Sequence, residues 1–222
     1  VTLKKINSGS FKVSLEDSAV AATKSWALLS TNQKNISSLR LTDATPVLKL
    51  TAAQTTAGAG LIDKISNNSL SLTVADSGTN LSTNMTGLLA INSKITKITQ
   101  TAVGNLAVSA SQLQSEELTS LLGKLSPTSY GLTVSGADKT NIVSILANTH
   151  VKSVALNVTD GTLTSSDAAI HAALQSSKIT SIAVSNASIT NLGTLSSDKR
   201  VRSIGIKDSA INLSNEANLS AL

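Results

Sequence analysis

Short runs of alternating apolar and polar residues recur along the whole chain, and each run predicts a β-strand. Val154, Leu156 and Val158, for example, stand at every second position, which is the period of a half-buried strand. The distance between a run and the second run after it is nearly constant at first. It is 59 residues from Val13 to Leu72 and 59 residues from Leu39 to Ile98. A strand-bearing unit therefore recurs eight times, in pairs, centred on Val13, Leu39, Leu72, Ile98, Leu132, Val154, Ile182 and Ile204.

The segments between these runs carry apolar residues at helical spacing. Residues 112–125 show it most clearly, with five leucines and with Glu116 and Glu117 near the start, where carboxylates stabilise a helix dipole. Residues 17–33, 52–65, 79–94 and 138–150 have the same kind of spacing. After Val158 we expect a turn at Asp160-Gly161, a short extended piece at Leu163, and a helix over residues 164–178 capped by Ser165 or Ser166.

A strand followed by a helix, repeated along the chain, predicts parallel strands in one sheet with helices behind it. We therefore expect the α/β class and a repeat solenoid of about eight turns, with a parallel sheet on one face, helices on the other, and a leucine-rich-repeat-like architecture. Residues 1–222 would form a single repeat array. The alternative is an all-β parallel helix, in which the segments between the runs are further strands. The leucine clusters favour the first arrangement.

Composition supports a thin hydrophobic core. The chain of 222 residues is 41% hydrophobic but holds a single Phe, a single Trp and a single Tyr. Aromatic side chains normally fill the thick core of a globule of this size. A core one side chain deep, renewed at every turn of a solenoid, needs Leu, Ile, Val and Ala instead.

Several kinds of protein and site are excluded by the residues that are missing. The chain has no cysteine, so disulfides and thiolate metal sites cannot form. No apolar run approaches the roughly 20 residues that span a bilayer. Val1 begins directly in array-like sequence without a signal peptide, and residues 215–222 end without a polar cap. We therefore expect the sequence to be an excerpt from a longer protein.

Aspartate closes the strand in five of the eight units, at Asp17, Asp43, Asp76, Asp160 and Asp208. In stacked turns these side chains would form a ladder with a spacing of about 4.8 Å. Two interpretations are open: the ladder binds calcium, or each side chain accepts hydrogen bonds from local backbone N–H groups in an Asx turn. The glycine-rich calcium pattern G-G-x-G-x-D is absent from the sequence, which favours the Asx turn and no cofactor.

Residues that could carry out catalysis are few. His150 falls just before a strand, and Asp167 and His171 form an i, i+4 pair that is typical of a surface ion pair on a helix. The adjacent Glu116 and Glu117 point to different helix faces, which does not suit acid–base catalysis across one bond. No phosphate loop, dinucleotide-binding fingerprint or zinc spacing occurs. We therefore predict that the chain is not an enzyme.

Positive charge is placed periodically in this chain, whose net charge is +5 at pH 7. Cations directly precede four predicted strands, where they would stabilise the dipole of the helix just before by roughly 0.3–1 kcal/mol each; these are Lys94, His150, Lys178 and Arg200. A second set lies within the strands: Arg40, Lys97, Lys152 and Arg202.

On stacked strands this second set would form a basic ridge along the exposed face of the sheet. Such a ridge suits a polyanion such as an anionic polysaccharide. The other interpretation is that the charges keep the chain soluble and protect strand edges. The aromatic side chains that stack on bases are missing, so nucleic acid is not an expected partner.

Two stretches resemble repeats of a known group of proteins. They are ISSLRLTDATPVLKLTAAQ at residues 36–54 and ITSIAVSNASITNLGTLSSDKRVRSIGIKDS at residues 179–209. Both look like repeats of very large secreted bacterial surface proteins, which are rich in Ser, Thr, Ala and Asp, lack cysteine, are often exported by type I secretion systems, and are described as adhesin-like or surface-layer-like. Members are usually acidic, whereas this chain is basic. The resemblance implies a spacer or adhesive module and carries over no site residues.

Together these observations predict a structural or adhesive repeat module of an extracellular bacterial surface protein, acting as a spacer and an interaction surface. The expected partners are neighbouring repeats, a further copy of the chain, or a cell-surface polysaccharide. Two alternatives stay open. The chain could be a recognition domain that binds an anionic polysaccharide or another polyanion along the basic ridge, or a noncatalytic segment of a larger secreted enzyme or toxin.

Overall fold

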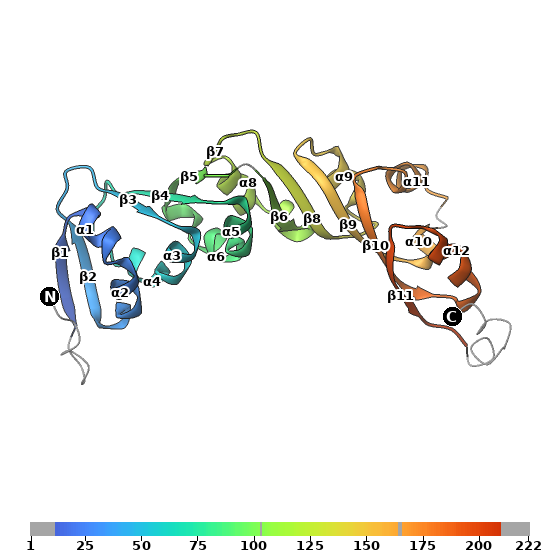
Figure 1. Cartoon of the computed structure of the whole chain (residues 1–222), viewed down its shortest axis with the longest axis horizontal. Coiled ribbons are helices and arrows are strands. Elements are labelled where there is room, and N and C mark those ends of the chain that lie inside the picture. Colours follow the sequence, from blue (N-terminus) through green and yellow to red (C-terminus); the bar gives the residue numbers. More distant parts are fainter. Residues whose placement is uncertain (1–11, 103, 164–165, 210–222) are drawn as a thin grey trace. The chain divides into compact units, whose positions relative to one another are not determined.

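The computed structural model describes residues 12–102, 104–163 and 166–209. Helices and parallel strands alternate along these residues, so the chain has the α/β class predicted from the sequence (Figure 1). The helices make the all-β alternative wrong. The chain divides into two compact units, which are unit 1 (Val1–Gly104 with Glu116–Ser129) and unit 2 (Asn105–Ser115 with Tyr130–Leu222).

The strands of unit 1 are all parallel and lie in two sheets. One sheet pairs β1 with β2, and an isolated bridge joins Leu39 of β2 to Ile65. The other has the order β3-β4-β5-β7. The elements of unit 1 are β1 (Val13–Asp17), α1 (Ala19–Lys24), α2 (Trp26–Thr31), the 3-10 helix η2 (Gln33–Asn35), β2 (Ile36–Leu41), β3 (Val47–Leu50), α3 (Ala52–Ala57), α4 (Ala59–Ile62), β4 (Ser71–Asp76), α5 (Gly78–Thr83), α6 (Met85–Ala90), η3 (Asn92–Lys94), β5 (Ile95–Gln100), α8 (Glu116–Leu122) and β7 (Leu125–Ser126).

Unit 2 holds one parallel sheet of five strands with the order β11-β10-β9-β8-β6. Each strand of this sheet pairs with the strand of unit 2 that comes directly before or after it along the chain. The elements of unit 2 are β6 (Asn105–Ser109), α7 (Ala110–Leu113), β8 (Gly131–Ala137), α9 (Ile142–Ala147), β9 (Val151–Thr159), α10 (Asp160–Leu163), α11 (Ala168–Leu174), β10 (Ile179–Ala187), η4 (Ile189–Asn191), α12 (Leu192–Ser197) and β11 (Val201–Ile206).

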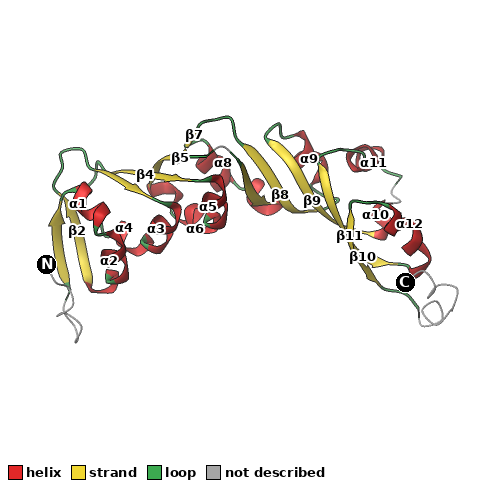
Figure 2. Ribbon diagram, viewed as in Figure 1, coloured by secondary structure: helices red, strands yellow, loops and turns green. Residues whose placement is uncertain are grey.

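In each unit the helices lie on one side of the strands (Figure 2). Strand residues that point to the helices are buried, and their register matches the predicted alternation: Leu48 pairs with Leu72, and Val74 with Ile98. From the helices, Leu81 and Leu88 are buried opposite them. The core is thus one layer of strand side chains against one layer of helix side chains, which the near-absence of aromatic residues predicts.

Polar residues that follow the strands start the helices. The side chains of Ser18, Thr51, Ser77 and Ser109 accept a hydrogen bond from the backbone N–H three residues later. Two of these sites are full capping boxes, because Gln54 and Gln112 bond back to the cap residue. Such caps satisfy N–H groups that a helix leaves without an internal partner, and each contributes about 1 kcal/mol.

Trp26 anchors the packing of one helix on the next in unit 1. Its side chain is fully buried, and its indole N–H donates to the carbonyl of Gln54 at 2.9 Å. A Cβ atom on Gly58 would lie 2.6 Å from the indole ring, so only glycine fits at this position without a shift. Gly58 therefore allows α3 and α4 to approach the indole closely.

Several local predictions are wrong. The strands β3, β6 and β7 were not expected, and residues 17–33, 52–65 and 79–94 hold two short helices each instead of one. The breaks fall at Ser25, Gly58 and Asn84, where ψ is near 10° and outside the helical range. Residues 112–125 likewise divide into α7 and α8. A helix that must follow the stacked strands beneath it has to change direction, and a non-helical residue provides the change.

Two more corrections concern residues 160–178. Asp160 and Gly161 do not form a turn but begin α10, which also contains Leu163. The helix cap is Asp167, whose Oδ1 accepts from the N–H groups of Ala169 and Ile170. Ser166 precedes the cap, and Ser165 lies outside the described residues. An aspartate is an equally good cap, and the run of serines hid which residue takes the role.

Candidate functional site

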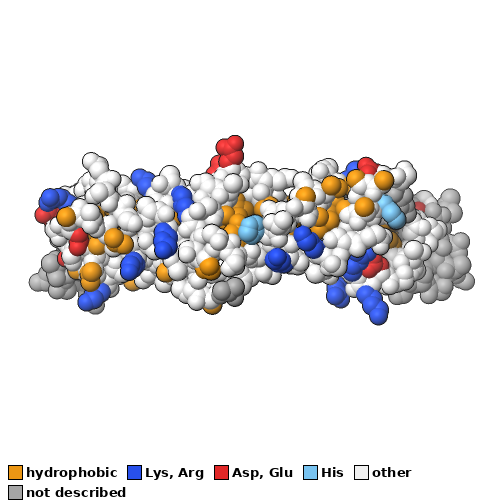
Figure 3. All heavy atoms as spheres, turned by 90° about the horizontal axis from the view of Figure 1, so that it is seen from above, with side chains coloured by type: hydrophobic (Ala, Val, Ile, Leu, Met, Phe, Trp, Pro, Cys, Tyr) orange, Lys and Arg blue, Asp and Glu red, His pale blue; other side chains and the backbone are white. Residues whose placement is uncertain are grey.

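The strand faces that point away from the helices carry mostly hydroxyl side chains. Bonds between neighbouring strands join Ser71 to Thr96 and Ser153 to Thr133, each at 3.0 Å between oxygens. Lysine and arginine side chains are dispersed among uncharged side chains on the face shown in Figure 3. These faces offer hydrogen-bonding groups and single charges, which suits a polar partner rather than an apolar one.

A β-bulge recurs at the second residue of several strands. The register skips Ser37 in β2, Thr96 in β5, Lys152 in β9, Thr180 in β10 and Arg202 in β11. At three of these positions a hydroxyl reaches the preceding strand, as Thr96 does to the carbonyl of Leu72 at 2.9 Å. A bulge re-aims the side chain that occupies it. The bulges therefore decide where the predicted basic residues point.

The predicted basic ridge does not occupy one equivalent position. Lys152 and Arg202 are the bulge residues of β9 and β11, whereas Lys97 follows the bulge of β5. Arg40 lies in β2, in the other sheet of unit 1, and its guanidinium contacts Glu16 of β1 at 3.1 Å. All four side chains belong to exposed residues. The structure brings none of the four beside another in strand register.

Lys97 has a different basic neighbour, which the sequence pattern missed. In the sheet β3-β4-β5, Lys49 pairs in register with Thr73, and Thr73 pairs with Lys97. The two lysines are exposed and two strand spacings apart, about 10 Å. Lys49 belongs to the short alternation Val47-Leu48-Lys49-Leu50, a signal that the spacing of the eight longer runs had hidden.

The five predicted calcium ligands accept hydrogen bonds from backbone N–H groups at helix starts. A carboxylate oxygen of Asp17, Asp76 and Asp208 accepts from the N–H of the next residue. This bond is local, but it is not an Asx turn, in which the N–H two residues on donates. The second oxygen of Asp76 accepts from the N–H of Ala52 at 3.0 Å, so it reaches the helix that begins 24 residues earlier.

Three other aspartates also accept a hydrogen bond from the backbone at the start of a helix in a neighbouring segment. Asp43 accepts from Ala19 N at 2.6 Å, Asp208 from Ile189 N at 3.0 Å, and Asp160 from Ser188 N at 3.2 Å. Within residues 12–102, 104–163 and 166–209, no three His, Asp or Glu side chains gather as a metal site would need. Four of the five aspartates thus tie one strand–helix segment to its neighbour through a helix N-terminus, where a carboxylate is favoured.

Lysine and arginine side chains that directly precede strands form a corresponding bond, in which they donate to an oxygen near the C-terminal end of a helix in a neighbouring segment. Lys124 Nζ donates to the backbone and side-chain oxygens of Asn92 at 2.6 and 2.7 Å, Lys178 to the carbonyl of Leu146 at 3.1 Å, and Arg200 to that of Leu174 at 2.6 Å. Lys64 donates in the same way to the carbonyl of Gln33. Lys178 and Arg200 were expected to stabilise the helix just before them, whereas Lys64 and Lys124 were not singled out from the sequence. All four bond to an oxygen 26 to 32 residues earlier, near the end of another helix.

Lys94 and His150, which were also predicted to precede a strand directly, behave differently. Lys94 lies 3.7 Å from Asp63, and both side chains are at least half exposed, so this pair contributes little. His150 contacts the carbonyl of Tyr130 through Nδ1 at 3.1 Å, and the two rings stack with centroids 4.2 Å apart. His150 thus packs on the neighbouring segment, which explains why a histidine is suited to the place of a lysine.

Local bonds shift the pKa of several charged groups. Hydrogen bonds from the side chain and the N–H of Thr140 lower the pKa of Asp138, and the hydrogen bond from Arg200 lowers that of Asp198. Burial alone would raise the pKa of Asp76, but bonds from Asn80, Ser77 and Ala52 together outweigh it and lower the pKa. Burial lowers the pKa of Lys124. Asp76 and Lys124 belong to the ties, Asp198 is the residue that ends α12, and Asp138 precedes α9 and bonds locally to Thr140.

The residues considered for catalysis do not come together. His171 lines a hollow of about 240 Å³ in unit 2 with Leu174, Leu195 and Arg200 around it, while Asp167 caps α11. Glu116 and Glu117 are exposed in the first turn of α8.

None of the helices in the described part combines the length and apolarity that a membrane crossing needs. Comparison with models of protein families finds no match, and comparison with curated protein sequences finds none either.

Proposed function

We propose that this chain is a noncatalytic structural and adhesive module of an extracellular bacterial surface protein, and that its strand–helix segments are the coils of an α/β solenoid. Equal spacing of the elements supports the solenoid. The helices α1 and α5 begin at Ala19 and Gly78, and the strands β2 and β5 begin at Ile36 and Ile95, which in both cases is 59 residues apart. A repeat unit that consists of two coils and occurs twice accounts for this spacing.

The ties between neighbouring coils are the observation that carries the structural role. A carboxylate reaches the N-terminus of a helix in the adjacent coil, as Asp76 does to Ala52, and a cation reaches the C-terminus, as Lys124 does to Asn92. In the coil that runs from α1 to η2 both ends of the helix layer are fixed in this way, by Asp43 at Ala19 and by Lys64 at Gln33. A module that holds two attachments apart under load needs connections of this kind between its coils.

Single-molecule force spectroscopy tests the role. We expect resolvable unfolding peaks when the chain is pulled from its two ends, and a lower peak force in a Lys124→Met variant, which keeps the apolar stem and loses two charged hydrogen bonds worth about 1–3 kcal/mol. Lys24→Met is the matched control, because Lys24 is an exposed lysine of the same unit. Unfolding without a resolvable peak, or an equal effect of both variants, would contradict a structural module that resists force.

Lys49 and Lys97 favour a second candidate function, the binding of a polyanion. They flank Thr73 on an outer strand face rich in hydroxyl groups, so anionic groups about 10 Å apart on a polysaccharide would meet both charges. Dextran sulfate is a suitable probe. Its binding should weaken steeply between low and physiological salt, because exposed charges are screened.

The variant with Lys49→Gln and Lys97→Gln should bind this probe at least about tenfold more weakly at low salt, since both charges are lost. The matched control replaces two other exposed lysines of unit 1, Lys24 and Lys34. Equal loss in both double variants would indicate attraction to net charge alone. The absence of any binding at low salt would remove this candidate.

A further inference from the structure

One strand edge in unit 1 has no neighbour among the described residues. The strand β1 pairs with β2 on one side, and the sheet ends there. An edge of this kind presents backbone N–H and C=O groups that can pair with another strand. What the edge pairs with depends on the side chains that stand along it.

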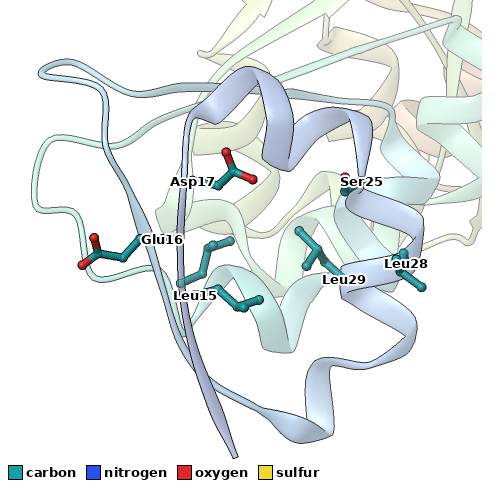
Figure 4. A pocket seen from close by; sticks show the side chains of 7 residues that line it. Leu15, Glu16, Asp17, Ser25, Leu28 and Leu29 are labelled. Carbon is teal, nitrogen blue, oxygen red and sulfur yellow. The ribbon is translucent and has the colours of Figure 1, made fainter. Parts of the chain in front are cut away.

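The two sides of β1 differ sharply. Val13 and Leu15 are half-buried, whereas Ser14 and Glu16 are exposed, as is Lys12 directly before the strand. Figure 4 shows Glu16 pointing to the side of the strand opposite Leu15. The outer side of β1 therefore carries a positive, an uncharged and a negative side chain in turn.

We propose that β1 pairs antiparallel with β1 of a second copy of the chain, with Ser14 opposite the partner's Ser14. Residues directly opposite in an antiparallel pair share a side of the sheet, so a two-fold pairing has a residue at its centre. With Ser14 at the centre, Lys12 faces the partner's Glu16, and Val13 faces the partner's Leu15. Two ion pairs form on the outer side, and apolar residues meet on the inner side.

The neighbouring register is unfavourable. Centring the pair on Leu15 sets Val13 opposite the partner's Asp17 and Ser14 opposite the partner's Glu16. Glu16 then loses the partner's Lys12 and keeps only Arg40 of its own chain, and Asp17 lies opposite an apolar side chain. Edge strands that avoid association often carry charges of one sign, which repel in a self-pairing. On this edge the oppositely charged Lys12 and Glu16 are placed symmetrically about Ser14. A second copy of the edge in antiparallel orientation is therefore complementary in charge, which is why we choose a second copy as the partner.

The apolar surface beside the edge supports the same occupant. A hollow of about 170 Å³ opens there, lined by Leu15, Leu28, Leu29 and Leu39 with Ser25, Glu16 and Asp17 (Figure 4). Leu28 is 50% exposed. Extending the sheet across the β1 edge covers this surface with the inner face of the partner's sheet. Apolar area is thus removed from water together with the pairing of the strand.

Disulfide trapping tests the register, and the absence of native cysteine makes it specific. In the proposed pair the two Ser14 Cβ atoms lie about 4.5–5.5 Å apart, close to disulfide geometry. The variant Ser14→Cys should form a covalent dimer under oxidation. Ser38 is the matched control, because it pairs with Ser14 in register one strand further from the axis, which leaves about 14 Å between the two copies. Equal trapping of both variants, or trapping of Ser38→Cys alone, overturns the proposal.

Sedimentation velocity over a range of protein concentrations tests the ion pairs. The chain should dimerise, and Lys12→Glu and Glu16→Lys should each weaken the dimer at least about tenfold through like charges opposite one another. The double variant should restore the dimer. Lys24→Glu on α1 is the charge control. A monomer at every concentration, or a dimer unaffected by Lys12→Glu, overturns the proposal. The proposal makes specific the association with a further copy of the chain that was expected from the sequence. A monomer would leave the unfolding force of the single chain unchanged, so this proposal and the structural role fail separately.

Discussion

The side-chain amide of Asn67 takes the place of a strand residue beside Leu41. Its Oδ1 accepts from the N–H of Leu41 at 2.7 Å, and its Nδ2 donates to the carbonyl of Leu41 at 2.8 Å. The isolated bridge between Leu39 and Ile65 ends two residues earlier, so the amide continues the pairing where the backbone turns away. Without it, both backbone groups of Leu41 would lose their partner on this side.

Replacing Asn67 by alanine should destabilise unit 1 by about 1–2 kcal/mol, because two hydrogen bonds to a partly buried backbone are lost. Trp26 is the single tryptophan of the chain and is buried in unit 1, so its fluorescence during urea unfolding reports this unit. Asn68→Ala, at the exposed neighbouring position, should leave the midpoint unchanged. Equal midpoints for both variants would show that the amide contributes no stability.

Replacing Gly58 by alanine should destabilise unit 1 by about 1–3 kcal/mol, since the new Cβ would lie 2.6 Å from the Trp26 ring and overpacking strains the core. The same substitution at Gly193 in α12 adds a Cβ with no atom within 4 Å, and there it should stabilise by about 0.5–1 kcal/mol. Urea unfolding followed by far-ultraviolet circular dichroism measures both. A stabilising Gly58→Ala would mean that the indole moves aside at no cost.

Replacing Asn186 by alanine should destabilise unit 2 by about 1 kcal/mol, because its φ of 55° lies in the left-handed region that a Cβ disfavours. Gly136 takes a φ of 71° one residue before the equivalent buried alanine of β8, so Gly136→Ala should have the same effect. Asn186→Gly should be neutral or stabilising. Thermal unfolding of the three variants tests the conformational cost, and a destabilising glycine would show that the asparagine side chain matters instead.

Acid should destabilise the chain as the pH falls below about 4. The pKa of Asp76, Asp138 and Asp198 is lowered from 3.8 in the folded chain, so these carboxylates contribute stability above that value and lose it as the pH falls through the folded pKa. Urea midpoints between pH 7 and pH 2 measure the effect. Asp198→Asn should flatten the profile, whereas Lys199→Ala at the exposed neighbouring position should not. An unchanged slope in Asp198→Asn would assign the acid sensitivity to other groups.

The class and the strand positions could be predicted because alternation is a local signal. Val74 and Ile98 follow the rule of buried and exposed positions, and their register is as the pattern implies. Short strands such as β7, with two residues, are too brief for any periodicity, and the need for a glycine at residue 58 comes from the Trp26 ring, which is far away in the sequence. These features depend on tertiary contacts that a single sequence window does not contain.

The roles of the charged residues were harder to predict, for the same reason. The sequence marks Lys178 as the residue before a strand, but not that its ammonium bonds to a carbonyl 32 residues earlier. Lys49 was overlooked because its strand has four residues. Lys97 follows the bulge of β5 whereas Lys152 occupies the bulge of β9, and no composition rule reports such a shift of the register by one residue.

The reach of the ties has a consequence for how such a chain evolves. Each bond from a lysine, arginine or aspartate extends to the adjacent block of roughly thirty residues and no further. If these blocks are the repeating coils proposed above, a duplicated block would bring with it its own strand and many of the groups that bond to its neighbour. Lengthening by recombination within the gene would then need few compensating mutations elsewhere.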